Sequence, residues 1–290
     1  MSLWPQILLS GIIAGSVYAL VALGFVLIYK ATNVIHFGLG EQVSLGAYLV
    51  VILQIFLGVA FWPAVLMALF VAGLIGFLIE RLVLRPIAPQ PVLVQIIATL
   101  AVGLCIREGL RGFMGPHPWP FPPLLSTDPR SFAGLNFDLA SVAIVVVSIA
   151  VMLILYGIFN YTKFGQAILA VCQNPVGASL MGIPVPAMLS SIWIMASVLA
   201  AIAGILLAPV VTLSPEMGLI GIKGFVVAVL GGFTSLPGAI LGGFILGIIE
   251  TAMGTFISTA VKDATTYALL IVLIIVWPHG LFGHVFVKKV

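Results

Sequence analysis

The sequence predicts an all-α polytopic membrane protein, and the observations behind this are its composition, its low charge and the length of its apolar runs. Of 290 residues, 62% are hydrophobic and 7% are charged, and the mean hydropathy is +1.33. A soluble domain carries about 25% charged residues, so this chain has too few charges to cover a surface that faces water. Lipid is therefore the expected solvent for most of its surface.

The apolar runs are long and do not alternate with polar residues, which predicts membrane-spanning helices and not the strands of a barrel. A bilayer core requires about 20 mostly apolar helical residues. We expect eight or nine spans, because the seventh run is short and contains Lys223. In chain order, the predicted spans cover residues 5–29, 42–60, 62–82, 92–113, 139–160, 188–211, 218–233, 238–257 and 264–283.

The first span is expected to remain in the mature protein, because no Lys or Arg precedes it and no cleavage site of small residues follows it. Lys and Arg favour cytoplasmic loops, so their positions indicate the orientation. With the amino terminus outside, the inner loops hold Lys30, Arg81, Arg85, Lys163, Lys288 and Lys289. The outer regions hold Arg107, Arg111, Arg130, Lys223 and Lys262, so the bias favours this orientation weakly.

Glycine recurs at four-residue steps inside the spans, as in Gly11 and Gly15 of the first and Gly243 and Gly247 of the eighth. Helices immersed in lipid gain little from the hydrophobic effect when they associate, so small residues that let backbones approach supply the packing. The chain is therefore expected to form a tight bundle.

Residues 114–138, between the fourth and fifth spans, are rich in proline and aromatic residues and carry Asp128 and Asp138. Several prolines leave this segment no helix or strand to form, because proline lacks the backbone donor. An extracytoplasmic loop is the favoured interpretation. An ordered cap over the outer mouth is the alternative.

Residues 161–187, between the fifth and sixth spans, form an inner segment that is too long for a simple connection. Its helical pattern consists of Ala167, Ala170, Val171 and Asn174, at steps of three and four residues. Asn174 is suited to cap a following helix, because Pro175 fits the first helical position and Gly182 fits the end. Ala178 and Met181 would then share one face of that helix.

This segment is therefore expected to be a short helix held outside the bilayer, with a small, apolar exposed face. Such a face suits docking into a groove of a partner protein better than contact with water. The alternative is a helix that lies on the membrane surface and packs against the bundle.

Ionisable residues at membrane depth raise a functional question, because they are costly to bury. Glu250 is the deepest, and no other span carries an acid at its centre, so a carboxylate hydrogen-bonded inside the bundle is favoured over a proton relay. Glu108 and Arg111 share a helix face at the end of a span and are expected to pair. Without a chain of buried acids, ion-coupled transport lacks its usual machinery.

Several function classes are excluded by the motifs that the sequence lacks. It contains no phosphate-binding loop with a Gly-Lys pair, and no His-Glu-x-x-His or Gly-x-Ser-x-Gly motif, so an enzyme is not expected. Cys105 and Cys172 have no spacing typical of a disulfide framework or zinc site, and no cofactor is expected. The charges form no basic face, so nucleic acid is not an expected partner.

At residues 161–187 the sequence also resembles a known family. The segment is similar to the coupling-helix region of the permease subunits of bacterial branched-chain (hydrophobic) amino acid ABC importers. The residues that carry this resemblance are Gly165, Ala167, Ala170, Asn174, Ala178, Met181, Gly182 and Ile183. Three further segments agree in order and spacing, so the resemblance covers nearly the whole chain.

The amino-terminal segment contains Asn33, His36, Gly40, Glu41, Gly46, Ala47 and Tyr48. The carboxy-terminal segment contains Ser214, Pro215, Met217, Gly218, Lys223, Phe225, Gly231, Gly232, Ser235, Pro237, Gly238, Ala239, Gly242, Gly243 and Glu250. The terminal segment contains Pro278, Gly280 and Gly283. The sequence departs from the family at Phe233, where a glycine is usual, and at Lys163 with Phe164, which replace a more basic start of the loop.

The resemblance implies a type II ABC importer permease bundle of eight or nine transmembrane helices in one domain, residues 1–290, in the bacterial cytoplasmic membrane. The implied partners are two ATP-binding subunits, a second homologous permease, an extracytoplasmic solute-binding protein and membrane lipid. ATP hydrolysis would fall to the partner subunits. This chain would form half of the translocation pathway for branched-chain or related amino acids.

The resemblance also implies roles for particular residues. Coupling to the ATPase is assigned to Ala167, Ala170, Asn174, Gly177, Ala178, Met181, Gly182 and Ile183. Helix packing or the pathway is assigned to Asn33, Gly40, Glu41, Gly46, Gly231, Gly232, Ser235, Gly238 and Glu250. The alternatives are an importer permease for urea or short amides, and a stand-alone channel or secondary carrier.

Overall fold

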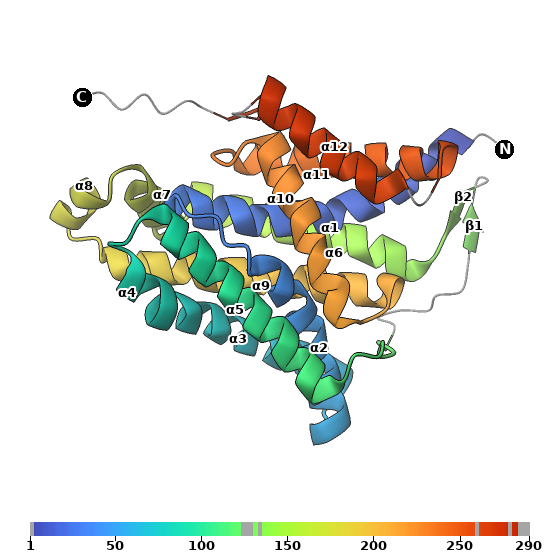
Figure 1. Ribbon diagram of the computed structural model, residues 1–290, viewed down its shortest axis with the longest axis horizontal. Coiled ribbons are helices and arrows are strands. Elements are labelled where there is room, and N and C mark those ends of the chain that lie inside the picture. The colour runs from blue at the N-terminus through green and yellow to red at the C-terminus, as the bar shows by residue number, and fades with distance from the viewer. Residues whose placement is uncertain (1–2, 123–129, 133–134, 259–260, 278–279, 284–290) are drawn as a thin grey trace.

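The computed structural model describes residues 3–122, 130–132, 135–258, 261–277 and 280–283, which form a bundle of helices (Figure 1). The α-helices are α1 (Leu3–Thr32), α2 (Leu39–Leu57), α3 (Phe61–Leu78), α4 (Arg85–Ile87), α5 (Val92–Met114), α6 (Leu139–Tyr161), α7 (Lys163–Gln173), α8 (Pro175–Leu180), α9 (Val185–Val211), α10 (Ile220–Gly231), α11 (Leu236–Phe256) and α12 (Val261–Val276). A π-helix, η1 (Ile79–Leu84), continues α3, and a 3-10 helix, η2 (Pro215–Leu219), leads into α10.

Every predicted span overlaps a helix, although the ninth, 264–283, continues beyond the end of α12 at Val276. The prediction of an all-α polytopic membrane protein is confirmed. Among the described residues, seven helices are long and apolar enough to cross a membrane. α10 and α12 are shorter, with 12 and 16 residues. The weak seventh span is thus a short 3-10 helix followed by a short α-helix.

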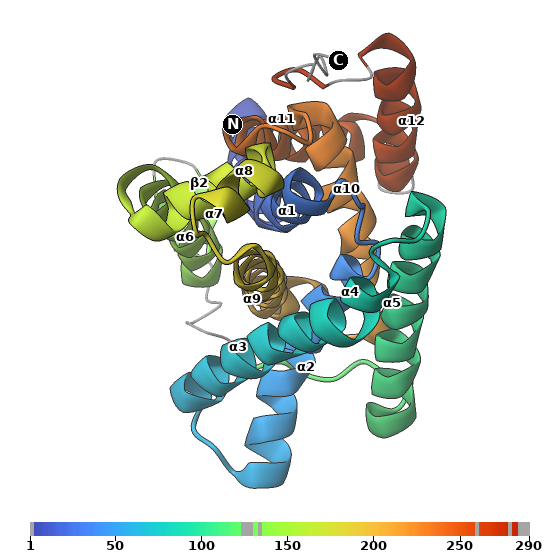
Figure 2. The ribbon, with the colours of Figure 1, turned by 90° about the vertical axis from the view of Figure 1, so that its left-hand side faces the viewer.

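The two ends of the bundle carry different elements (Figure 1). One end, here called the α8 end, holds α4, α7 and α8 and is the end seen in Figure 2. The opposite end, the hairpin end, holds the first residues of α1 and the strands β1 (Arg130–Phe132) and β2 (Leu135–Phe137).

The prediction that residues 114–138 form no strand is wrong. β1 and β2 pair antiparallel, and Trp119 forms an isolated bridge with Leu213. The residues of β1 and β2 follow the last proline of the segment, Pro129, so their backbone donors are available. Asp138 ends the segment and caps α6, because its side chain accepts a hydrogen bond of 3.0 Å from the Ser141 amide. Asp128 lies outside the described residues.

α1 is the central helix, with 83% of its most apolar window buried, and it packs against α9, α10 and α11. The two predicted glycine spacings meet at the crossing of α1 and α11. A Cβ atom added to Gly15 would lie 2.7 Å from the Gly243 carbonyl oxygen, and one added to Gly11 would lie 2.7 Å from the Cα of Ile248. The predicted packing through glycine is therefore confirmed at this crossing.

The outer helices expose large apolar side chains. Phe70 of α3 and Ile275 of α12 are each 75% exposed, and Leu66 of α3 is 70% exposed. A surface of this kind is unfavourable in water but suits lipid chains or another membrane protein. The exposed faces therefore agree with a bundle that is surrounded by a bilayer.

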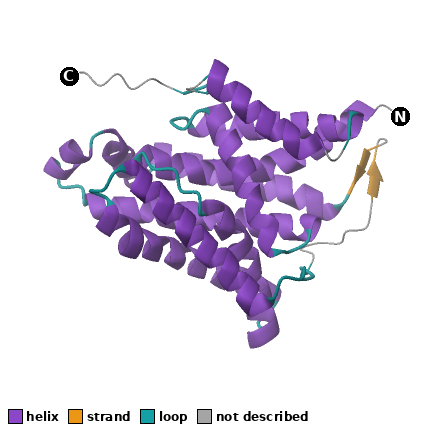
Figure 3. Cartoon of the chain, viewed as in Figure 1, coloured by secondary structure: helices purple, strands orange, loops and turns teal. Residues whose placement is uncertain are grey.

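α2 begins inside the bundle and not at its end, because the loop after α1 runs back toward the centre (Figure 3). α1 ends at Thr32 and is followed by Asn33, whose φ is +54°. Gly38 then packs against Thr99 and Gly103, which lie well inside α5. The Phe37 amide donates a hydrogen bond of 3.2 Å to the Thr99 hydroxyl. Interrupted helices at membrane depth are typical of transporter pathways.

Candidate functional site

The segment between α6 and α9 contains two capped helices. Thr162 accepts a hydrogen bond from the Gly165 amide at 3.0 Å and begins α7, and Asn174 accepts one from the Gly177 amide at 2.9 Å and begins α8. Gly182, whose φ is +81°, follows the end of α8. The predicted cap at Asn174 is therefore confirmed. The segment was expected to hold one short helix, and it holds two, because the Asn174 cap separates α7 from α8.

One face of this helix pair packs on the bundle and another is exposed. Ile168, Val171 and Ala178 are buried. A Cβ atom added to Gly165 would collide with the Ile158 carbonyl, so α7 lies close against α6. The side chains of Val176, Leu180 and Met181 are 70%, 84% and 83% exposed. We call these three residues the α8 patch.

The α8 patch differs from the expected small face. Ala178, predicted to be exposed, is buried, and Met181 lies beyond the last residue of α8. Steps of three or four residues show which positions share a face but not which way the face points, and docking on the bundle decided that. Of the other residues assigned to coupling, Ala167, Ala170, Gly177 and Ile183 are half-buried, and Asn174 and Gly182 are exposed.

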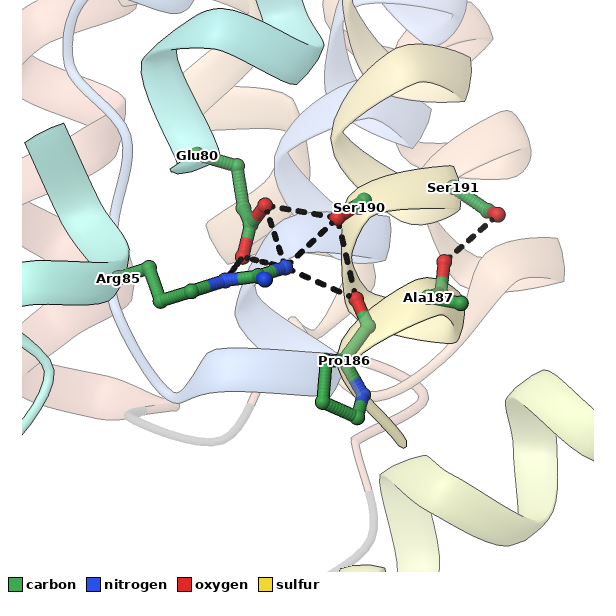
Figure 4. A network of polar contacts seen from close by, with 6 residues as sticks. All are labelled: Glu80, Arg85, Pro186, Ala187, Ser190 and Ser191. Carbon is green, nitrogen blue, oxygen red and sulfur yellow. Dashed lines mark hydrogen bonds and ion pairs between the residues drawn. The ribbon is translucent and has the colours of Figure 1, made fainter. Parts of the chain in front are cut away.

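A polar network holds the start of α9 to η1 and α4 (Figure 4). Glu80 is buried and accepts two hydrogen bonds from Arg85, at 2.9 and 3.0 Å, and one from the Ser190 hydroxyl at 2.7 Å. Arg85 also donates to the Pro186 carbonyl at 3.1 Å. Sequence reasoning counted Arg85 only as an inner charge, because the π-helix that places Glu80 beside it has no signal in the sequence.

Three of the amino-terminal candidates, Gly40, Glu41 and Gly46, lie where α2 meets α9, η2 and α10, whereas Asn33 follows the end of α1. A Cβ atom on Gly46 would collide with Ala201 of α9, and one on Gly40 would collide with the backbone of Gly218 and Gly221. Glu41 follows Gly40 and faces the same junction. Glycine at these positions lets the interrupted helices touch through their backbones.

The turn between α10 and α11 brings together four more candidates. Ser235 caps α11 by accepting a hydrogen bond of 3.1 Å from the Gly238 amide. Gly231 and Gly238 are in backbone contact, and Gly232 has a φ of +93°. The Leu281 amide donates to the Leu230 carbonyl at 2.8 Å, so the terminal segment fastens this turn. Pro278 of that segment lies outside the described residues.

Glu250 belongs to a buried ion cluster. Its side chain is 1% exposed and lies 2.6 Å from the Lys223 ammonium and 3.4 Å from the Lys262 ammonium. Lys223 also pairs with Asp263 at 2.9 Å. A search for acidic partners along the sequence missed this arrangement, because the partners are lysines from the weak seventh span and from the start of α12.

A second charged cluster lies near the hairpin end of α5. Glu108 and Arg111 pair at 3.2 Å, as predicted, and Arg111 also donates to Glu216 of η2 at 2.6 Å. Arg107 lies 3.8 Å from Glu41. Among the described residues, no group of three or more His, Cys, Asp and Glu side chains is placed to hold a metal ion.

Comparison with known proteins gives consistent matches. A family model described as "Branched-chain amino acid transport system / permease component" matches residues 7–277. The high-affinity branched-chain amino acid transport system permease protein LivH of Salmonella typhimurium is 30% identical, over 98% of this chain and 97% of that protein. The corresponding protein BraD of Pseudomonas aeruginosa is also 30% identical over the same shares.

A solved structure shows the same fold. PsaBC from Streptococcus pneumoniae, in complex with Fab, aligns with a TM-score of 0.51 over 96% of this chain and 93% of that chain. Its sequence is 15% identical, so the likeness concerns the fold alone.

Proposed function

The chain belongs to the family of branched-chain amino acid transport system permease components, and from this premise we propose that it forms one half of the translocation pathway of an ATP-driven importer. Membership makes it a non-catalytic, multi-pass protein of the cytoplasmic membrane with the type II importer permease fold. The solute in this proposal is a branched-chain or related amino acid. The partners are two ATP-binding subunits, a second homologous permease and an extracytoplasmic solute-binding protein.

The observation that carries the coupling role is the α8 patch. The α8 patch, made of Val176, Leu180 and Met181, is exposed at one end of the bundle. In this proposal that end lies outside the bilayer, so lipid chains do not cover the patch. Exposed apolar side chains on a short, rigid helix suit a groove on a partner protein. The α8 patch would therefore be the contact with an ATP-binding subunit.

This role places the α8 end in the cytoplasm and the hairpin end outside. Lys30 at the end of α1, Arg81 and Arg85 in η1 and α4, and Lys163 in α7 all belong to the α8 end. Their gathering there agrees with the preference of basic residues for the cytoplasm. Lys288 and Lys289 lie outside the described residues. Residues 161–187 would then be cytoplasmic and residues 114–138 extracytoplasmic.

The contacts of α7 and α8 suggest how movement would spread. α7 packs on α1, α6 and α9, and α8 connects to α9 through residues 181–184. The Glu80, Arg85 and Ser190 network then holds the start of α9 to η1, so a push on α8 would move these elements together. Closure of the ATPase dimer would thereby shift the population between inward-open and outward-open bundles.

The experiment is ATP-driven uptake of radiolabelled L-leucine by the complete complex in proteoliposomes. The variant Leu180→Glu introduces a charge into the apolar contact and is expected to lower uptake and stimulated ATPase activity together by about tenfold or more. Gln90→Glu, an exposed site at the same end but outside α8, serves as the matched control. Unchanged uptake in Leu180→Glu would rule out α8 as the coupling element.

The alternatives predict other results in the same assay. A stand-alone channel or secondary carrier would move the solute without the ATP-binding subunits. An importer for urea or short amides would show ATP-driven uptake of those solutes and not of leucine. Because selectivity in such importers resides largely in the binding protein, the assay must include that subunit.

A further inference from the structure

A cavity of about 380 Å³ lies where the interrupted helices meet, between α2, α5, η2 and α10. Its volume falls within the range of about 300 to 1,000 Å³ that is usual for small-molecule sites. The walls are apolar except for one carboxylate and one guanidinium. The residues used below are Phe37, Glu41, Leu100, Leu104, Arg107 and Phe225.

Glycines keep this space open. Gly103, Gly218 and Gly221 all line the cavity. A Cβ atom added to Gly218 would collide with the Glu41 carboxylate, so any larger residue would displace that carboxylate. The junction of α2 with η2 is therefore shaped around the Glu41 side chain.

The two charged groups have unused hydrogen-bonding capacity. Glu41 and Arg107 are 14% and 28% exposed, and their closest oxygen and nitrogen atoms are 3.8 Å apart, which is too far for a hydrogen bond. Within the described structure, Glu41 Oε2 is buried without a hydrogen-bond partner, and Arg107 Nε, which also lacks one, lies 3.4 Å from the Glu108 carboxylate in an ion pair. Buried charged atoms that lack hydrogen-bond partners are costly. A polar ligand between these two groups could therefore form hydrogen bonds that the protein itself does not make.

An aromatic cluster closes the cavity toward the α8 end. The ring of Phe225 lies 5.5 Å from Phe37 and 5.6 Å from Phe233 between centroids, and Phe233 lies 4.6 Å from Tyr29 near the end of α1. The cluster thus connects the cavity lining at Phe37 and Phe225 to the last turns of α1. Phe233 connects the ring of Phe225 to that of Tyr29.

We propose that this cavity is a transient subsite for a zwitterionic α-amino acid with an apolar side chain, an inference that rests on the proposed function. The Arg107 guanidinium would receive the carboxylate and the Glu41 carboxylate would receive the ammonium group. Phe37, Phe225 and Leu100 would contact the apolar side chain. A neutral solute such as urea could form hydrogen bonds with these two groups but no ion pair with either of them.

The test is uptake of radiolabelled L-leucine by the complete complex in proteoliposomes, together with ATP hydrolysis stimulated by the leucine-loaded binding protein. Arg107→Gln and Glu41→Gln are each expected to lower the uptake rate by about tenfold, because each removes a charge-assisted bond to the solute. Stimulated ATP hydrolysis should remain within about twofold, since the α8 patch is intact. Arg111→Gln, one turn along α5 and outside the cavity lining, is the matched control.

A second variant keeps the proposal testable if the charge variants do not reach the membrane. Leu104→Trp fills the cavity from a side chain that is 50% exposed, and Leu93→Trp on the same helix, 67% exposed and outside the lining, is its control. Loss of uptake in Leu104→Trp alone, with ATP hydrolysis retained, supports the subsite. Normal uptake in Leu104→Trp or in the charge variants would overturn it. No ATP-driven leucine uptake by the unaltered complex would instead overturn the proposed function, and the subsite with it.

Discussion

The two sides of the bundle are built differently. On one side α1, α10 and α11 meet through glycine backbones and a close ion pair between Lys223 and Glu250, and 83% of the α1 window is buried. On the other side α5 buries 11% of its window and carries glycines with open space around them. We call these the packed half and the α5 wall.

This difference indicates which side of the bundle is more stable and which side can open locally. In the packed half the buried Glu250 carboxylate forms close ion pairs through one oxygen, Oε1, which lies 2.6 Å from Lys223 and 3.4 Å from Lys262, while its Oε2 has no hydrogen-bond partner among the described residues. The α5 wall leaves Arg107 and Glu41 without full hydrogen bonding beside a cavity. Regions with few buried contacts open at lower free energy than the core, so the α5 wall is the side suited to bind and release a ligand.

The largest effect is expected from Lys223→Met in the packed half. Glu250 would keep only the Lys262 ammonium at 3.4 Å, and a buried carboxylate that loses its closest partner costs about 3 kcal/mol. The measurement is the Tm of the purified chain in detergent. The double variant Lys223→Met with Glu250→Leu should recover most of the loss, and an unchanged Tm in the single variant would contradict the comparison.

Two matched glycine variants are expected to change the stability by a smaller amount, with a loss in the packed half and a gain in the α5 wall. In Gly247→Ala the new Cβ atom would meet the backbone of Gly11 and Gly15, which should destabilise the packed half by about 1 to 3 kcal/mol. In Gly109→Ala it would meet nothing within 4 Å, so the helix propensity of alanine should stabilise the α5 wall by up to about 1 kcal/mol.

The Tm of the two glycine variants can be compared under one set of conditions. If both variants shift the Tm in the same direction, the two halves do not differ in packing as described. Uptake by the complete complex is a second readout, because loss of the α1 and α11 crossing would abolish it.

The smallest effect concerns the exposed pair of Arg111 and Glu216. The hydrogen bond from Arg111 holds the pKa of Glu216 below its usual value of 4.5. The pair therefore adds stability above the ordinary carboxyl pKa, and this is lost as the pH falls through the lowered value. The Tm difference between the unaltered chain and Arg111→Gln should be slight at neutral pH and vanish in acid. A difference that grows in acid would contradict this.

Much of the fold could be predicted because lipid imposes a simple rule on the sequence. A helix that crosses a bilayer must be long and apolar, so each run of such residues indicated a helix. A helix cap could also be predicted from the sequence, since Asn174 followed by Pro175 indicated the start of α8. The coupling role and the pathway role of individual residues remain proposals.

The wrong predictions and the contacts that were not predicted share one cause. Each depends on the orientation of a helix or on contact between residues far apart in the chain. The period of α8 did not show that Ala178 points inward, and proline content did not exclude strands beyond the last proline. The cavity at Glu41 and Arg107 depends on α2 beginning inside the bundle. Nothing local to either residue marks that position.

The sequence by itself determined that this chain is a helical membrane protein, where its helices run and which family it resembles, because hydropathy, caps and motifs are properties of short stretches. Only the tertiary structure decided which charges meet, since Lys223 finds Glu250 and Arg111 finds Glu216 across helices distant in the chain. In a medium without water, buried polar groups depend on one another for partners, and only the packing of the helices determines which partners they reach.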